Sequence, residues 1–355
     1  MATLGPVTEA HRFDEAALDR WLAEQGLPGA GRGLTVLQFQ GGQSNPTYRV
    51  EAGEHAYVLR KKPPGKLLPS AHMVEREYRV MAALAQTDVP VPVMRLLCED
   101  TQVIGTAFYV MDFLEGRIPG EPSLDEGYTP DERAAIWDSM NDAMAKLHNV
   151  DPAAVGLGDF GKPANYVGRQ IDRWSKQFEA SKTDPMPDMD NLIAWLRDRE
   201  QPADEVSIVH GDFRLPNLML HPTEPTVIAI LDWELGTLGH PLSDLAYNCM
   251  PYRMPYDEKA LKGMVGLDLA ARGIPAEEDY VAAYCRRTGR ESIPDMPFFR
   301  AFSFFRLAAI CQGVYARGLA GNASSLDALE VGAKALGCVA GYQLGARRVR
   351  KGRRR

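Results

Sequence analysis

Short apolar runs bounded by glycine and proline dominate the first third of the chain. They predict strands over residues 34–40, 47–50, 57–62 and 107–113. Apolar residues at helical spacing predict one helix before these strands, over residues 13–22, and one between the third and fourth, over residues 73–85. This part of the chain is therefore expected to be rich in β-structure.

The pattern turns helical from about residue 129. Thr129-Pro130-Asp131-Glu132 has the form of a capping box with proline at the first helical position, which predicts a helix start. The apolar stripe that follows is expected to be core and comprises Trp137, Met140, Met144 and Leu147. Further helices are predicted over residues 166–180, over 190–199 and from 243 onward, with a strand over 227–231.

This order predicts an α+β fold with two lobes. Five strands with one helix are typical of the N-terminal lobe of a protein-kinase-like fold, and a largely helical C-terminal lobe would follow. We expect a hinge near residues 112–117 to separate them. The predicted domains are a nucleotide-binding lobe over residues 1–113, a helical lobe over 114–345 and a basic tail over 346–355.

Composition narrows the class of protein. The 355 residues suffice for two lobes, and 45% hydrophobic with 25% charged residues is typical of a soluble globular protein. A net charge of -7 makes nucleic acid an unlikely partner, and we interpret the basic tail as solvated. No apolar run reaches the length of a membrane span, and the first residues lack an export signal. We expect a cytoplasmic protein.

Cysteine usage agrees with that compartment. The five cysteines show no CxxC spacing, so reduced thiols are expected rather than disulfides or a zinc site. Cys311 and Cys338 lie in apolar helical runs and are expected in the core.

The segment Val209-His210-Gly211-Asp212-Phe213-Arg214-Leu215-Pro216-Asn217 carries the strongest chemical signal. An apolar run ending in Asp232 follows it. This spacing is typical of phosphotransferases that bind MgATP, with Asp212 as catalytic base and with Asn217 and Asp232 as magnesium ligands. His210 is expected to brace the loop by hydrogen bonding.

Candidate nucleotide contacts lie upstream. In the loop 41–46, Gly42 lets the backbone approach phosphate, and Ser44 and Asn45 add polar side chains. On the third strand Arg60 would grip the α- and β-phosphates, in a place where lysine is usual. Its expected ion-pair partner is Glu77, or otherwise Glu75. Backbone groups of Asp112 and Leu114 would read the adenine edge.

Together these motifs resemble the aminoglycoside phosphotransferase-like family, which includes choline and homoserine kinases. The resemblance rests on VHGDFRLPN, on ILDWELGTLGHPLSDLAY and on the long helical insert between Leu147 and Val206. It implies that Asp244 is a structural residue supporting the metal loop. It is closest to the branch fused to acyl-CoA dehydrogenases, as seen in YVLRKKPPGKLLPSAHMVEREYRVM and LHNVDPAAVGLGDFG. That branch implies hydroxyacyl-CoA thioesters or hydroxy acids as acceptors and a functional link to acyl-CoA dehydrogenases.

Alternatives remain at this point. The aromatic segment 298–306 carries Arg300 and Arg306, with Arg317 at helical spacing, and it favours either an anionic substrate or a core helix whose arginines reach solvent. The predicted activity is MgATP-dependent O-phosphorylation of a small-molecule hydroxyl. The alternatives are a non-catalytic pseudokinase module that binds nucleotide or acyl-CoA, and an aminoglycoside-modifying enzyme.

Overall fold

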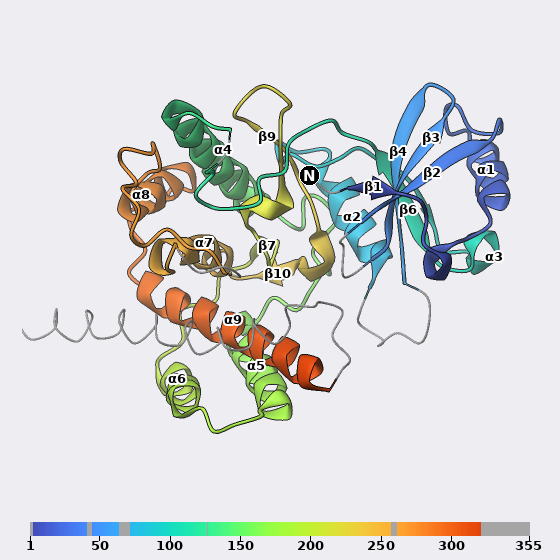
Figure 1. Cartoon of the computed structure of the whole chain (residues 1–355). Helices are drawn as coiled ribbons and strands as arrows, with labels where there is room; N and C mark the ends of the chain where they lie inside the picture. The colour runs from blue at the N-terminus through green and yellow to red at the C-terminus, as the bar shows by residue number, and fades with distance from the viewer. Residues whose placement is uncertain (1–2, 41–44, 64–71, 126, 257–260, 321–355) are drawn as a thin grey trace, which may run out of the picture. The chain divides into compact units, whose positions relative to one another are not determined.

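The structure is a computed structural model that describes residues 3–40, 45–63, 72–125, 127–256 and 261–320 (Figure 1). By its contacts the chain forms two compact units, each of which combines two separate stretches. They are Met1–Ile118 with Leu218–Gly236, and Pro119–Asn217 with Thr237–Arg355.

The first unit is built on a six-stranded antiparallel sheet. Its spatial order is β1-β2-β3-β4-β6-β5, with neighbouring strands paired throughout. The strands are β1 (Leu4–Gly5), β2 (Leu34–Phe39), β3 (Thr47–Ala52), β4 (His55–Lys61), β5 (Met94–Cys98) and β6 (Phe108–Asp112). The helices of this unit are α1 (Glu15–Glu24), α2 (Val74–Leu84) and α3 (Thr101–Ile104), with a 3-10 turn at Glu9–His11.

Alternation along β4 directs neighbouring side chains to opposite faces of the sheet. Leu59 is fully buried in an apolar cluster with Leu18 and Leu22 of α1. Arg60, the next residue, instead meets Glu77 of α2. Because successive strand residues point to opposite faces, one strand both anchors the core and presents a cation to α2.

The first unit also contains the hairpin of β8 (Leu218–Leu220) and β9 (Val227–Ile230), followed by a 3-10 turn at Trp233–Leu235. The sequence prediction included these residues in the helical lobe. Gly116 lets the chain after β6 approach this hairpin closely, because a Cβ at that position would lie 2.6 Å from the Leu220 carbonyl oxygen. The chain just after β6 thus runs in direct contact with β8, and Arg117 forms a β-bridge with Leu220.

The second unit is largely helical. Its long helix α9 (Met296–Leu319) packs against α5 (Tyr166–Ser181), α6 (Pro187–Asp198) and α7 (Leu242–Asn248) (Figure 1). Helices α4 (Pro130–Asn149) and α8 (Glu277–Arg287) pack together, and β7 (Ser207–Val209) pairs with β10 (Thr237–Gly239). A 3-10 turn lies at Leu215–Asn217 and another at Met250–Arg253.

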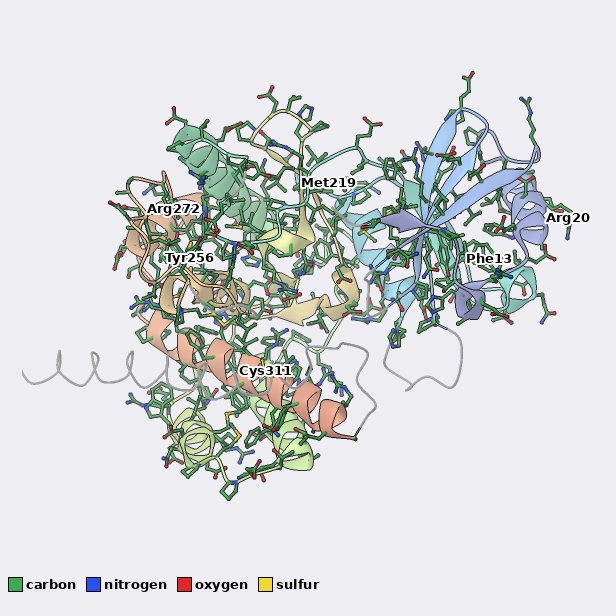
Figure 2. The ribbon with its side chains drawn as sticks, viewed as in Figure 1. Phe13, Arg20, Met219, Tyr256, Arg272 and Cys311 are labelled. Atoms are coloured by element: carbon green, nitrogen blue, oxygen red, sulfur yellow. The ribbon has the colours of Figure 1, made fainter. Side chains whose placement is uncertain are left out.

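These elements confirm the α+β class, with an antiparallel sheet followed by a helical part. The predicted apolar stripe of α4 is confirmed as core, because all four of its residues are at most 1% exposed. Cys311 is buried on α9, as expected (Figure 2), whereas Cys338 lies outside the described residues. Strands β1, β5, β7, β8 and β10 are not in the sequence prediction.

The missed strands of the six-stranded sheet, β1 and β5, lie at its two edges, and the other three belong to two-stranded sheets. β1 has only two residues, and β5 pairs with β6 alone through a shifted register. Short edge strands lack the sustained alternation on which sequence prediction depends. Within the described part of the chain, no helix is long and apolar enough to cross a membrane.

The capping box of α4 yields a stability prediction. The Thr129 side chain accepts a hydrogen bond from the Glu132 N–H at 3.2 Å, and the Glu132 carboxylate accepts one from the Thr129 N–H at 2.7 Å. Thr129→Ala should lower the free energy of unfolding by about 1 kcal/mol in urea titrations, because it leaves an N-terminal N–H of the helix unsatisfied. Ser292→Ala, at an exposed position outside a helix, is the control. Equal losses in both variants would contradict this account.

Candidate functional site

In the second unit, the candidate catalytic loop connects β7 to the 3-10 turn that ends at Asn217. The Asp212 carboxylate Oδ2 accepts hydrogen bonds from Asn217 Nδ2 at 2.8 Å and from Arg214 Nε at 3.2 Å. Asn217 Nδ2 also donates to the Asp212 carbonyl at 2.8 Å. Because the amide nitrogen faces Asp212, the other end of the amide, Oδ1, is left as the atom that can face a cation.

The backbone before Asp212 has a fixed and unusual conformation. His210 is fully buried, and its Nδ1 accepts a hydrogen bond from the Asp212 N–H at 3.2 Å. This confirms that His210 braces the loop. Gly211 has a φ of 82°, a left-handed conformation that favours glycine. Gly211 thus permits the tight turn that leads into Asp212.

Asp244, at the start of α7, holds this turn from beneath. It is fully buried, and its Oδ2 and Oδ1 accept hydrogen bonds from the backbone N–H groups of His210 at 2.6 Å and Gly211 at 2.9 Å. Burial alone would raise the pKa of Asp244, but the hydrogen bond and charge of His148 and the neighbouring His210 lower it below its ordinary value. Asp244 is therefore a structural carboxylate, and the part of the chain that it holds is the turn that leads into Asp212.

Arg306 of α9 meets the same turn from another direction. It is only 6% exposed, and its Nη2 donates to the Gly211 carbonyl oxygen. Of the two alternatives for this segment, the one in which its arginines reach solvent is therefore wrong for Arg306. Arg300 is partly buried and bonds Glu277 at 2.7 Å, whereas Arg317 is exposed. The three arginines thus have three different environments despite their helical spacing.

A cavity of about 230 Å³ lies within the second unit beside the loop. Its walls are mostly apolar, and Arg214, which bonds Asp212, is among its polar lining residues with Tyr247 and Lys262. Of the described residues that line it, the one carboxylate is Glu121, which is paired with Lys262 at 2.7 Å. The cavity is therefore suited to an apolar body and offers little negative charge to a polycation.

In the first unit, Arg60 lies between two carboxylates. Its Nε lies 3.1 Å from Glu77 Oε2, and its Nη2 lies 2.6 Å from Asp232 Oδ1. Glu75 instead pairs with Lys62 at 2.7 Å. Of the two glutamates considered from the sequence, the structure places Glu77 next to Arg60.

Glu77 is the buried centre of this cluster, with 1% of its surface exposed. Its Oε1 accepts a hydrogen bond from Asn45 Nδ2 at 2.7 Å and its Oε2 one from the Tyr109 hydroxyl at 3.1 Å. Burial raises the pKa of Glu77 to about 7, with a further contribution from the charge of Asp232, against the opposing effect of Arg60. The Asn45 side chain is therefore engaged inside the unit. Gly42 and Ser44 lie outside the described residues.

Asp232 follows β9 in a strained backbone conformation. Its φ of 62° and ψ of 62° are left-handed, which is uncommon for a residue other than glycine. Trp233, the next residue, is buried and its indole N–H donates to the Ile230 carbonyl at 2.9 Å. The packed tryptophan holds the strand end, so Asp232 keeps a conformation that commonly marks a functional position.

At the predicted hinge, the backbone N–H groups of Asp112 and Leu114 differ in whether they donate a hydrogen bond within the described residues. The Asp112 N–H donates to the Val93 carbonyl at 2.9 Å, and its carboxylate binds Arg95 at 2.7 Å. The Leu114 N–H has no hydrogen-bond partner within the described part of the chain. This N–H is the Leu114 group that the sequence predicts at the adenine edge.

The candidate magnesium ligands are one amide and one carboxylate. Among the described residues, no three His, Cys, Asp or Glu side chains are grouped closely enough to hold a metal. Each candidate ligand offers a hard oxygen donor of the kind that magnesium takes together with phosphate oxygens and water. Asn217 belongs to the second unit and Asp232 to the first.

Three loop contacts are absent from the sequence prediction: Arg214, Tyr247 and Asn248. Asn248 Nδ2 donates to the Phe213 carbonyl at 3.3 Å, and Tyr247 lies beside Asp212 and has its pKa raised by burial and by that carboxylate. Tyr247 and Asn248 lie three and four residues after Asp244, which is about one helical turn. That spacing is the signal that could have identified them.

Comparison with known proteins gives one family. The model of a family described as "Phosphotransferase enzyme family" matches residues 35–294. Mouse acyl-CoA dehydrogenase family member 10 is 45% identical over 329 residues, which are 92% of this chain and 30% of that protein. Rat acyl-CoA dehydrogenase family member 11 is 45% identical over 90% of this chain and 42% of its own length. The chain thus spans less than half the length of these curated relatives.

Solved structures agree on the fold. A Ralstonia eutropha protein provisionally described as an aminoglycoside phosphotransferase is 48% identical with a TM-score of 0.86, covering 95% of this chain and 99% of its own. Choline kinase from Cryptosporidium parvum is 14% identical, with a TM-score of 0.64 and coverages of 95% and 97%. Aminoglycoside phosphotransferase APH(4)-Ia, complexed with ADP and hygromycin B, is 15% identical, with a TM-score of 0.54 and coverages of 94% and 98%. The last two show the kinase-like fold alone.

The environment of Asp244 predicts a pH-dependent stability. Asp244→Asn should lower the free energy of unfolding by about 2 kcal/mol at pH 7, because hydrogen bonds to a charged group are lost. Since the fold lowers the pKa of Asp244, its contribution is complete above the ordinary pKa of about 4 and is lost as the pH falls through the folded value. The difference from wild type should therefore shrink below about pH 4.

Urea titrations at several pH values would measure this difference. Asp279→Asn removes an exposed carboxylate from α8 and is the matched control, with little effect at any pH. A loss of stability in Asp244→Asn that stayed constant down to pH 3 would show that its charge is not what stabilises the loop.

Proposed function

Because the chain belongs to the phosphotransferase enzyme family, we propose that it transfers the γ-phosphoryl group of ATP to the hydroxyl of a small metabolite. The observation that carries this proposal is the arrangement of Asp212. Its carboxylate is 20% exposed, is oriented by Asn217 and Arg214, and stands on a turn whose backbone is fixed from beneath. Phosphoryl transfer needs such positioning more than it needs covalent participation by the protein.

In the proposed reaction, Asp212 is the catalytic base. The acceptor oxygen bonds to the γ-phosphorus while the bond from that phosphorus to the bridging oxygen of ADP breaks. The proton of the acceptor hydroxyl passes to the Asp212 carboxylate and then to water. Arg214 and Asn217 hold the carboxylate in the orientation that receives this proton.

The proposed nucleotide contacts come from the first unit. Arg60 would bind the α- and β-phosphates, oriented by Glu77, which in turn is held by Asn45. Its guanidinium keeps its charge, because Tyr109, Glu77 and Asp232 raise the pKa of Arg60 against the lowering effect of burial. Backbone groups of Asp112 and Leu114 would bind the adenine edge. Gly42 and Ser44 remain proposed phosphate contacts, and the ADP complex of APH(4)-Ia supports an adenine nucleotide.

Asn217 and Asp232 are the proposed magnesium ligands. When bound, the ion would neutralise charge on the phosphate oxygens. In the structure Asp232 is paired with Arg60, so the two groups that would face the phosphates already neutralise each other. Arg60 would exchange this contact for the phosphates when MgATP binds.

For the acceptor, we propose a hydroxyacyl-CoA thioester or a related hydroxy acid. The apolar cavity beside Arg214 supports an acceptor with an aliphatic body. The relatives named as acyl-CoA dehydrogenase family members support a link to acyl-CoA chemistry and to such dehydrogenases as functional partners. A polycationic aminoglycoside finds no such support, since Glu121 of the cavity is paired with Lys262. The cysteines of the described residues form no disulfide with one another, which agrees with a cytoplasmic setting.

The non-catalytic alternative is not favoured. It would rest on arginine replacing lysine at position 60, yet Arg60 is charged and paired with Glu77 as a phosphate-binding cation would be. The candidate base and both metal ligands are also present. A pseudokinase would typically lack one of these groups.

Removing the base tests the proposed activity. Asp212→Asn should reduce phosphoryl transfer by about 100-fold or more, because general base catalysis is lost while the side chain keeps its size. The assay is transfer of labelled γ-phosphate from MgATP to hydroxyacyl-CoA thioesters, free hydroxy acids, choline and aminoglycosides. We expect labelled product with the first two classes only.

The control is Asp188→Asn, which changes a carboxylate on α6 away from the loop. It should leave transfer unchanged. Product formed equally by wild type and Asp212→Asn would exclude Asp212 as the base, and labelled aminoglycosides would exclude the proposed acceptor class.

Arg60 gives a second test. Arg60→Gln should weaken MgATP binding by about tenfold or more, the loss expected when charge-assisted hydrogen bonds to phosphate are removed. Lys62→Gln is matched, because Lys62 is also a cation near the end of β4 and pairs with Glu75. Isothermal titration calorimetry should show a loss with Arg60→Gln and less than about a twofold change with Lys62→Gln. Wild-type affinity in a folded Arg60→Gln protein would remove Arg60 from the nucleotide site.

A further inference from the structure

Arg306 is a buried cation without a carboxylate partner in the described part of the chain. It is 6% exposed, and its buried Nε has no hydrogen-bond partner among the residues that the structure describes. Its guanidinium instead lies over the rings of Tyr247 at 5.3 Å and Trp174 at 5.7 Å. Burying a charge with aromatic faces as its main compensation is costly, so stability alone does not account for an arginine here.

Arg306 makes a polar contact with the carbonyl oxygen of Gly211, to which its Nη2 donates. The other polar group of Gly211, its N–H, donates to Asp244 Oδ1 at 2.9 Å. Asp244 of α7 and Arg306 of α9 are buried side chains of opposite charge, and they bind the N–H and the carbonyl oxygen of Gly211. That residue is a glycine with a φ of 82°, whose backbone would otherwise rotate freely.

The held carbonyl belongs to the peptide that leads into Asp212. The N–H of that same peptide donates to His210 Nδ1 at 3.2 Å. Both polar groups of the Gly211–Asp212 peptide are thus fixed, and the plane of this peptide sets the direction in which the Asp212 side chain leaves the backbone. Releasing the carbonyl would let the plane rotate and move the carboxylate.

We infer that Arg306 is a positioning residue for Asp212, acting through the Gly211 carbonyl. This inference rests on the proposed role of Asp212 as base. Tyr247 contributes to the same arrangement, since its ring packs on Arg306 and its hydroxyl lies beside the Asp212 carboxylate. Displacing a catalytic group by about 1 Å can lower the rate about 100-fold without changing what the enzyme binds.

The test replaces Arg306 with methionine, which retains an unbranched apolar chain and removes the charge and the donor. Arg306→Lys keeps the charge and should restore part of the activity. Arg300→Met is the matched control, because Arg300 is on the same helix and bonds Glu277 rather than the loop. Rates of ADP formation from MgATP are measured with a short-chain 3-hydroxyacyl-CoA and with water as the acceptor.

A second measurement does not depend on activity. Hydrogen exchange of the peptide spanning residues 207–217, followed by mass spectrometry, reports the opening of the loop backbone. In Arg306→Met we expect exchange to rise about tenfold, kcat to fall about tenfold or more and the KM for ATP to stay unchanged. The thermal midpoint should be retained or raised, because an unpaired buried charge is removed. Arg300→Met should instead lower the midpoint and leave loop exchange and kcat unchanged.

The outcomes separate the inference from the proposed function. Unchanged loop exchange in Arg306→Met would overturn the inference whatever the rates are. Raised exchange with an unchanged kcat would also overturn it. If Asp212→Asn has the wild-type rate, the base role fails and positioning of a base fails with it, while the effect on exchange remains as a purely structural result. If both hold, adding Arg306→Met to Asp212→Asn should cause no further loss of rate, because the residues act in series.

Discussion

The described part of the second unit depends on one buried carboxylate, that of Asp244. A fully buried negative charge is tolerable only when donors surround it, and here the donors are the backbone N–H groups of His210 and Gly211 together with His148. The same bonds that satisfy Asp244 determine the shape of the loop that carries Asp212. Asp244 thus couples the stability of the helical unit to the geometry of its candidate site.

Two further residues of helix α7 contact the same loop. Asp244, Tyr247 and Asn248 lie on one face of the helix and meet consecutive parts of the loop, from His210 to Phe213. Asn248 is itself held by the Tyr280 hydroxyl at 2.7 Å. One short helix therefore acts as a template for a loop that has little regular structure of its own, which is how a rigid scaffold commonly positions catalytic groups.

The first unit uses the same physical device. Glu77 is buried, accepts hydrogen bonds from Asn45 and Tyr109, and orients Arg60 on the neighbouring strand. In both units a buried carboxylate is satisfied by neutral and cationic donors, and it fixes a more exposed group that is proposed to meet the substrates. In each unit, the carboxylate at the centre of the polar network, Glu77 or Asp244, is thus inaccessible to water, and the group proposed for chemistry lies at the edge of that network.

The sequence by itself determined many of the elements and the spacing of most candidate residues, because these follow from local rules. Short apolar runs predicted β2, β3, β4 and β6 to within about two residues, the capping box predicted the start of α4, and the spacing from His210 to Asn217 predicted the loop. Tertiary structure decided what sequence spacing does not contain. It attached Leu218–Gly236 to the first unit, directed the Asn45 side chain to Glu77, and placed Arg306 inside rather than at the surface. These outcomes depend on contacts between residues distant in the chain, where burial and long-range hydrogen bonds outweigh the preferences of neighbouring residues.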